Sequence, residues 1–319
     1  MHKEFKQAVW DEEREQDWLR ILELAAREDL AAAGDCTTEA LVPHEARGIA
    51  AVAVRQAGVL AGEAAIVPTL TRFNARRARG MPASPGLKWS SLAHDGESLA
   101  PRQAIGVLEG SARAMLALER PLLNMLGRLS GIASLTRRYV DAVAGTRANI
   151  YDTRKTTPAW RSLEKYAVHC GGGRNHRAGL FEAVLIKDNH LALGAKLQPR
   201  GGGGYSPAEA VLKARQFLLE RFGETSRQMI VEIEVDTLEQ FDEVLAVEPD
   251  LILLDNMSPA VLREAVARRD AKHAAIELEA SGGIDLNTVR AAAEAGVERI
   301  SIGALTHSAV SLDFGLDWR

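Results

Sequence analysis

Charged and hydroxyl side chains crowd into the stretch YDTRKTTPAW, residues 151–160, directly after the apolar run ANI. Comparable polar groups end several later apolar segments. Together these residues are Asp152, Arg154, Lys155, Lys187, Asp188, Asn189, His190, Glu232, Glu234, Asp236, Asp255 and Asn256. Arginine forks match carboxylates and phosphates, whereas paired carboxylates can bind sugar hydroxyls, hold Mg²⁺ through water or stabilise a developing cation. The alternative for Glu234 and Asp255 is a structural ion pair with the lysines.

Small residues end two further segments, as SGG at Ser281, Gly282 and Gly283 and as IGA ending in Gly303 and Ala304. Such endings let backbone N–H groups approach an anion, so the two together predict a phosphate site. A simple tight turn is the alternative for SGG alone.

Glycine-rich stretches occur at CGGGRNHRAG, residues 170–179, and at RGGGGYSP, residues 200–207. In the first, His176 and Arg177 add cationic donors that suit carboxylate or phosphate oxygens, with a flexible surface loop as the alternative. The second has no charged partners downstream that would join a ligand site, and it indicates a flexible insertion without a ligand. A zinc site is not expected, because His169, Cys170, His176 and His190 lack the usual metal-ligand spacing.

The apolar segments and the stretches between them predict the elements that position these side chains. Strand-like segments occur in ANIYDTRK, AVLIKDNH, MIVEIEVD, LILLDNM, IELEASGG and RISIGAL, and helix-like segments such as TLEQFDEVLAV, PAVLREAVARRD and LNTVRAAAEAG lie between them. Parallel strands joined by helical crossovers predict an α/β barrel. The C-terminal strand ends of such a barrel converge on one mouth, where active sites form.

The first half of the chain has a different pattern. Residues 18–33 repeat apolar positions at helical spacing and stop at Gly34, and residues 48–108 show short strand-like runs typical of a small α+β region. Residues 111–143 read as long helices, with Pro121 marking a break or a first turn within them.

Length and charge exclude some classes of function. A chain of 319 residues is large enough for one barrel or two domains, and a net charge of −4 does not indicate a nucleic-acid or membrane partner. The charged N-terminus is unlike a signal peptide, and the apolar runs are short for a membrane span. With only Cys36 and Cys170 present, we expect a cytoplasmic protein.

The motifs, in this order, resemble those of the quinolinate phosphoribosyltransferases, also called carboxylating nicotinate-nucleotide pyrophosphorylases. The resemblance is carried by EDLAAAGDCTTEALVP, ERPLLNMLGRLSGIASLTRRYVDAVAGT, DTRKTTP, EKYAVHCGGGRNHR, LIKDNH, EIEVDTLEQ, LLDNM, EASGGI and ISIGALTHS. It implies a type II phosphoribosyltransferase fold: an incomplete α/β barrel with an N-terminal α+β sandwich domain. We expect these domains at residues 1–124 and 125–319, with a C-terminal tail that packs back on the first.

The reaction that the resemblance implies is transfer of a phosphoribosyl group from phosphoribosyl pyrophosphate (PRPP) to quinolinate with decarboxylation, on the de novo route to NAD. Its products are nicotinate mononucleotide, pyrophosphate and CO₂, and its cofactor is Mg²⁺. A homodimer is the implied working unit.

Individual site residues follow from the resemblance alone. Quinolinate would be held by Arg154, His176, Arg177 and Lys187, and by Arg120 from the dimer partner. The catalytic residues would be Glu234, Asp255, Lys155 and Lys187; Lys155 faces the PRPP phosphates, and Glu234 and Asp255 serve the ribose hydroxyls and Mg²⁺, partly through water. The 5-phosphate would be bound by Ser281, Gly282, Gly283, Gly303 and Ala304. The chain departs from the family pattern at Trp160, His169 and Pro121.

Three other functions remain open at this point. A Schiff-base aldolase could use Lys187, although its neighbour Asp188 makes the surroundings more polar than such a lysine prefers. A phosphoribosyltransferase-like protein of molybdenum transport and a non-catalytic sensor of a phosphosugar or a pyridine carboxylate are the other two.

Overall fold

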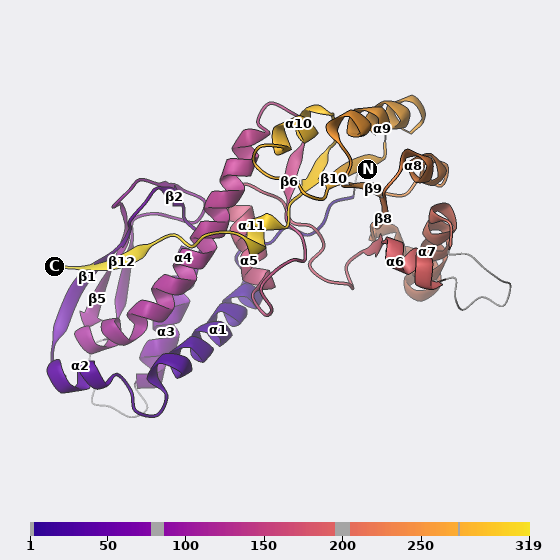
Figure 1. The fold of residues 1–319 in the computed structure, drawn as a ribbon. Coiled ribbons are helices and arrows are strands. Elements are labelled where there is room, and N and C mark those ends of the chain that lie inside the picture. Colours follow the sequence, from indigo (N-terminus) through magenta and orange to yellow (C-terminus); the bar gives the residue numbers. More distant parts are fainter. Residues whose placement is uncertain (1–2, 78–85, 195–204, 274) are drawn as a thin grey trace. The chain divides into compact units, whose positions relative to one another are not determined.

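The computed structural model describes residues 3–77, 86–194, 205–273 and 275–319, which form two compact units (Figure 1). Unit 1 comprises Met1–Lys6, Arg138–Lys155 and Arg174–Ala304, and unit 2 comprises Gln7–Arg137, Thr156–Gly173 and Leu305–Arg319. The domain boundary between residues 124 and 125 stays a prediction. The insertion around Gly201–Gly204 lies outside the described residues.

The elements follow the predicted order. Those of the first half are α1 (Glu12–Leu30), α2 (Cys36–Leu41), β1 (Arg47–Val54), β2 (Gly58–Val59), η1 (Glu63–Ala65), α3 (Ile66–Arg77), β3 (Lys88–Ser91), β4 (Ser98–Leu99), β5 (Ala104–Ser111) and α4 (Ala112–Ala142). Those of the second half are β6 (Asn149–Tyr151), α5 (Arg161–Cys170), β7 (Val184–Ile186), α6 (Asp188–Gly194), α7 (Pro207–Phe222), η2 (Gly223–Gln228), β8 (Val231–Val235), α8 (Leu238–Leu245), β9 (Leu251–Asp255), α9 (Pro259–Lys272), β10 (Glu277–Ser281), α10 (Val289–Glu294), β11 (Arg299–Ser301), α11 (Ala304–His307) and β12 (Phe314–Trp318).

Unit 1 is built on a parallel sheet of six strands in the order β6-β11-β10-β9-β8-β7. All six predicted strands are present. The first two of them in the chain, β6 and β7, form the two edges of the sheet, so the prediction of an incomplete barrel is confirmed. Helices α8 and α9 begin at side-chain caps, Thr237 and Ser258, that accept backbone N–H groups of the first turn.

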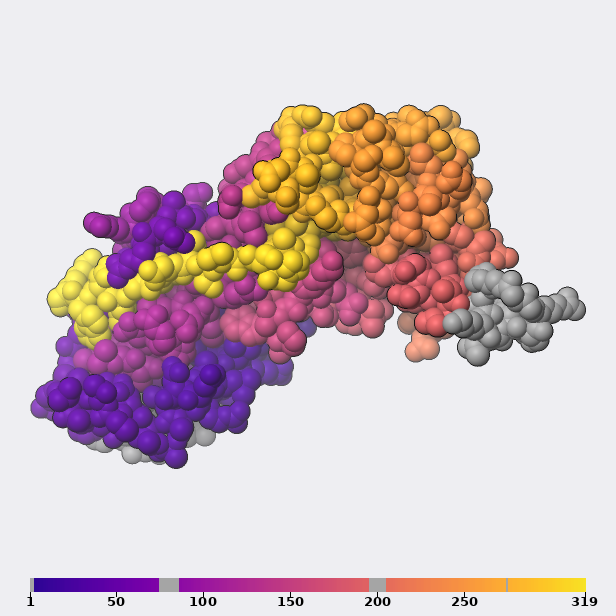
Figure 2. Space-filling view, in the orientation of Figure 1, coloured from indigo at the N-terminus to yellow at the C-terminus, as the bar shows by residue number. Residues whose placement is uncertain are grey.

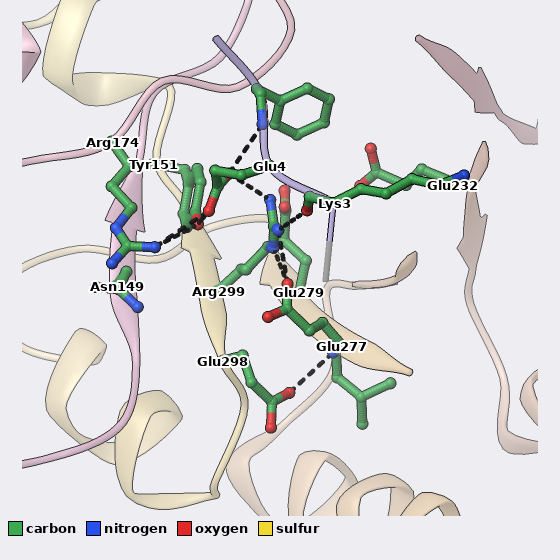
Figure 3. Close-up of polar contacts among 12 residues, drawn as sticks. Lys3, Glu4, Asn149, Tyr151, Arg174, Glu232, Glu277, Glu279, Glu298 and Arg299 are labelled. Carbon is green, nitrogen blue, oxygen red and sulfur yellow. Dashed lines mark hydrogen bonds and ion pairs between the residues drawn. The ribbon is translucent and has the colours of Figure 1, made fainter. Parts of the chain in front are cut away.

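Charged side chains lie inside the incomplete barrel, near the first residues of its strands (Figure 3). The buried Arg299 guanidinium donates to Glu277 at 2.6 Å and to Glu4 at 3.1 Å, and lies 4.8 Å from the ring centre of Tyr151. Tyr151 in turn donates its hydroxyl to Glu4 at 2.8 Å. The N-terminal segment is therefore part of the barrel interior.

Two neighbours of Glu4 fix this segment further. Lys3 pairs with Asp250 at 2.9 Å, just before β9, and Phe5 is buried with Ala183, Ile230 and Leu251. Both contacts lie where strands begin, so the segment closes the sheet at the end opposite to the residues that follow the strands.

Unit 2 contains an antiparallel sheet in the order β12-β1-β5-β3, in which β12 joins the C-terminus to β1. Figure 2 shows the C-terminal segment, in yellow, running along the magenta surface of α4. Gly127 and Gly131, one turn apart, allow this approach, since an added Cβ would lie 2.5 Å from the Leu312 carbonyl oxygen and 2.2 Å from that of Val310.

The prediction of a break at Pro121 is wrong, because α4 is one helix of 31 residues with Pro121 inside it. A proline deletes one hydrogen bond and crowds the preceding turn at a cost of about 3 kcal/mol. Leu118, Leu122 and Leu123 around it are buried, and their packing offsets this cost. Helix α1 also begins earlier than predicted, after the Asp11 cap.

Within the described ranges, no helix combines the length and the apolar character that crossing a membrane requires.

Replacement of Gly131 by Ala tests the contact between α4 and the C-terminal segment. Alanine normally favours a helix over glycine by about 1 kcal/mol. Here we expect the opposite sign, because overpacking costs about 1–3 kcal/mol and a backbone oxygen cannot rotate away. Thermal unfolding should occur at a lower temperature than in the wild type, while Arg138→Ala, on an exposed position of the same helix, stays close to it. A more stable Gly131→Ala protein would contradict the contact.

Candidate active site

Asp152 connects the two segments of unit 1 that carry Arg154 and Arg177. Its buried carboxylate accepts the backbone N–H of His176 at 2.8 Å and the side-chain amide of Asn175 at 2.7 Å. Since Asp152 begins the DTRK motif, the turn that carries Arg177 is fixed directly beside the segment that carries Arg154. The sequence marked Asp152 as a polar strand end, but nothing in it indicated this role.

Arg154 and Arg177 are close enough to repel each other. Burial lowers the pKa of Arg177, the charge of Arg154 lowers it further, and Glu232 opposes both. One nitrogen of Arg177 donates to the Ala183 carbonyl at 3.0 Å, whereas its buried Nε makes no hydrogen bond among the described residues. Two adjacent guanidinium groups, one with an unused buried donor, are suited to an anion with more than one negative charge.

Lys187 and Glu234 form an ion pair at the ends of β7 and β8. Burial raises the pKa of Glu234; Lys187 lowers it, and the nearby carboxylates of Asp255 and Asp236 raise it again. Burial likewise raises the pKa of Asp255, with Lys187 and Lys155 opposing and Asp236 adding to the rise. The structure thus brings together both predicted lysines and both predicted acids, and it adds Asp236.

The three carboxylates of Glu234, Asp255 and Asp236 are suited to a divalent cation, because a cation stabilises ionised carboxylates that lie close together, and burial and mutual repulsion raise the pKa values of Glu234 and Asp255. They do not form a compact ligand set. Among the described residues, the group whose ligand atoms all lie within 4.8 Å of one another is His176, Glu232 and Glu279. An ion at the three acids would accordingly keep bound water.

His176 lies deeper than the arginines. Its ring is buried, stacks on Phe5 with ring centres 4.5 Å apart, and places Nε2 3.1 Å from Glu232 and 3.7 Å from Glu279. Glu232 is fully buried inside the sheet, two residues before Glu234 on the same face of β8.

The SGG segment forms a turn in which the Gly282 position fits only glycine. Gly282 and Gly283 have φ values of 89° and 61°, and an added Cβ on Gly282 would lie 2.3 Å from the Asn256 side chain. Asn256 itself has a φ of 54° and donates its side-chain amide to Asp255 at 2.6 Å. The turn after β10 is therefore packed against the end of β9, next to the acids, and Gly303 and Ala304 follow the neighbouring strand β11.

Arg120 belongs to unit 2 and is described there by itself. It lies on α4 with its side chain largely exposed and 3.5 Å from Glu119. With Asn124, Gly127 and residues 311–314 it lines a small cavity.

Comparison with known proteins gives a consistent result. Two family models match the chain: Quinolinate phosphoribosyl transferase, N-terminal domain, over residues 35–130, and Quinolinate phosphoribosyl transferase, C-terminal domain, over residues 132–317. The chain is 39% identical over 294 residues to a carboxylating nicotinate-nucleotide pyrophosphorylase of Mycobacterium leprae (strain TN), covering 92% of this chain and 94% of that protein.

A chloroplastic protein of the same name from Arabidopsis thaliana is 35% identical over 315 residues, which cover 94% of this chain and 82% of that protein. Among solved structures, the nicotinate-nucleotide pyrophosphorylase from Francisella tularensis matches with a TM-score of 0.83 and 30% identity, covering 99% and 100% of the two chains.

The raised pKa of Asp255 predicts a stability effect. At pH 7 its ionised form is less favourable in the folded chain than in the unfolded chain, so Asp255→Asn should raise the melting temperature. The difference should shrink as the pH falls from the raised pKa of the folded state toward about 4, below which the carboxyl is protonated in both states. Melting curves between pH 4 and pH 8 measure this. As a matched control, Asp285→Asn should lower stability at pH 7, because hydrogen bonds lower the Asp285 pKa.

Proposed function

The chain belongs to the quinolinate phosphoribosyltransferase family, and from this membership we propose which of its residues carry out the family reaction. The protein is a pentosyltransferase of NAD synthesis. It transfers the phosphoribosyl group of PRPP to quinolinate, with decarboxylation to nicotinate mononucleotide. The observation that carries the residue assignment is the Lys187–Glu234 ion pair, which joins a cationic group of residues to an acidic one.

Quinolinate binds at the cationic group. Arg154, Arg177 and Lys187 neutralise its two carboxylates, and the buried unused Nε of Arg177 supplies one of the donors. His176 supports this group through its Nδ1, which accepts the backbone N–H of Arg177. The mutual repulsion of Arg154 and Arg177 is relieved when a dianion binds between them.

PRPP binds at the acidic group and the glycine turns. Glu234 and Asp255 accept its ribose hydroxyls, and Lys155, whose charge acts on Asp255, faces its phosphates. Backbone groups of Ser281, Gly282 and Gly283, with Gly303 and Ala304, bind the 5-phosphate, because the absence of side chains at the glycines leaves the main chain accessible.

The chemistry needs positioning and electrostatics rather than a strong base. The bond from ribose C1 to pyrophosphate breaks with oxocarbenium character, and the quinolinate ring nitrogen forms the new bond to C1. Glu234 and Asp255 stabilise the positive charge that develops on the sugar. The C2 carboxylate then leaves as CO₂, since the quaternised ring nitrogen accepts the electron pair, and a proton from solvent replaces it.

Magnesium is the cofactor that we propose for this site. Bound near Glu234, Asp255 and Asp236, partly through water, it supplies charge neutralisation for the departing pyrophosphate. The raised pKa values of Glu234 and Asp255 support this assignment.

We further propose a homodimer in which Arg120 of each chain serves the site of its partner. Its exposure on α4 leaves the guanidinium available for such a role.

We also propose a cytoplasmic location, since the two cysteines, Cys36 and Cys170, are both free thiols.

Turnover with purified protein tests the proposal directly. Quinolinate, PRPP and Mg²⁺ should yield nicotinate mononucleotide and CO₂, and a chelator should abolish the yield. Glu234→Ala should lower kcat by about two orders of magnitude or more, because charge stabilisation at the sugar is lost. Quinolinate binding, measured by calorimetry, should survive in that variant. An unchanged kcat would remove Glu234 from the mechanism.

Complementation tests the shared site. Arg120→Ala and Glu234→Ala proteins should each be inactive, because each lacks one component of the site. Mixing and re-equilibrating them should restore part of the activity, at most about a quarter, since half of the dimers are hybrids with one intact site each. No recovery, with subunit exchange verified by mass spectrometry, would count against a contribution of Arg120 to its partner.

A further inference from the structure

A second charged cluster lies inside the unit 1 sheet, below the residues assigned to substrate. It consists of His176 and two carboxylates, Glu232 on β8 and Glu279 on β10, which Figure 3 labels within the sheet. Both glutamates are fully buried. Strand β9 lies between their strands, so both side chains project to the same interior space across it.

Both nitrogens of the His176 ring are committed to protein groups. Nδ1 accepts the backbone N–H of Arg177 at 2.8 Å. Nε2 lies 3.1 Å from Glu232 and 3.7 Å from Glu279. The ring is thus held by carboxylates on one side and supports the main chain of Arg177 on the other.

The tautomer of the His176 ring distinguishes a metal site from a group that positions the neighbouring main chain. Because Nδ1 accepts a hydrogen bond, the proton of the neutral ring is on Nε2, where it faces the carboxylates. A metal at Nε2 would require the proton on Nδ1 instead, where it would oppose the Arg177 N–H. The cluster therefore fits a buried ion-paired group better than a metal centre.

We propose that Glu232 and Glu279 are positioning residues, which act through the His176 ring to fix the main chain of Arg177 and so its guanidinium at the quinolinate site. This inference rests on the proposed function. The Arg177 side chain has one further direct anchor, the Ala183 carbonyl, and its Nε is left for the ligand. The Asp152 contacts hold the residues before Arg177, whereas the ring of His176 contacts the main chain of Arg177 itself.

The cost of this arrangement argues for a role. Two carboxylates buried side by side are expensive, and burial together with the Glu232 charge raises the pKa of Glu279. Apolar side chains would fill a barrel interior at lower cost. Glu277, two residues earlier on β10, provides the contrast, since it is paired with the Arg299 guanidinium at 2.6 Å and belongs to the network at the strand starts.

The test uses Glu232→Gln, Glu279→Gln and the double variant, which keep the side-chain shape and remove the charge. We expect the KM and the calorimetric Kd for quinolinate to rise about ten- to a hundredfold, as for a misplaced binding group, and the KM for PRPP to change less than twofold. Glu277→Gln is the matched control, and its quinolinate affinity should stay at the wild-type value whatever happens to its melting temperature.

A spectroscopic measurement adds a readout that a purely structural role would not change. In protein labelled with ¹⁵N-histidine, with His176 assigned by comparison with His176→Gln, the wild type should show the proton on Nε2, and the double variant should show a mixture of tautomers.

Each remaining outcome counts against the inference. It is overturned by unchanged quinolinate affinity in the variants, by an equal loss of affinity for both substrates with a lowered melting temperature, or by a stoichiometric metal ion that the double variant loses. Should the double variant fail to fold, the two single variants decide by the same criteria. If the wild type itself makes no product from quinolinate and PRPP, the proposed function fails, whereas a working wild type with unaltered variants refutes only the role of the two glutamates.

Discussion

Charge buried within a parallel sheet is the constraint on which the rest of unit 1 depends. An ionised group taken out of water costs several kcal/mol unless partners are placed accurately. Arg299, with a side chain 2% exposed, meets this demand through Glu4 and Glu277 and through the rings of Phe5 and Tyr151. Since a one-residue shift of any of these strands would leave a charge unpaired, the interior fixes the register of the sheet.

Strands β8 and β10 contribute side chains both to the barrel interior and to the candidate site, so the packing of the interior fixes the positions of the site residues. Glu232 and Glu234 are two residues apart on β8, as are Glu279 and Ser281 on β10. Side chains two apart project to one face, so the lower member of each pair is held in the interior and the upper member reaches the site. A site built on strands whose lower residues are locked in this way is more accurately placed than one built on loops alone.

Local pattern predicted the strands and their polar ends because parallel strands are apolar on both faces and finish where the fold presents its chemistry. The α/β fold that this pattern implied is confirmed, and Lys187, Glu234 and Asp255 do come together. Two features of the fold could not be predicted from local sequence patterns. The contact of Glu4 with Arg299 joins residues 295 positions apart, and no local signal marks Glu4 as a partner. Pro121 reads as a helix breaker, and only the burial of its neighbours shows why α4 continues.

The guanidinium groups of the candidate site are already close together in the unbound protein, and this arrangement affects which anion would bind best. Arg154 and Arg177 are held near each other although they repel, and the fold offsets the cost with carboxylates below and beside them. If a dianion binds between them as proposed, it offsets this repulsion, so part of its affinity would come from a cost already present in the free protein. In the proposed site, a pyridine acid with a single carboxylate would offset less of this repulsion than a dianion. On the proposed assignment, the arrangement of charges in the unbound protein would therefore favour the acid with two carboxylates without steric exclusion of the smaller molecule.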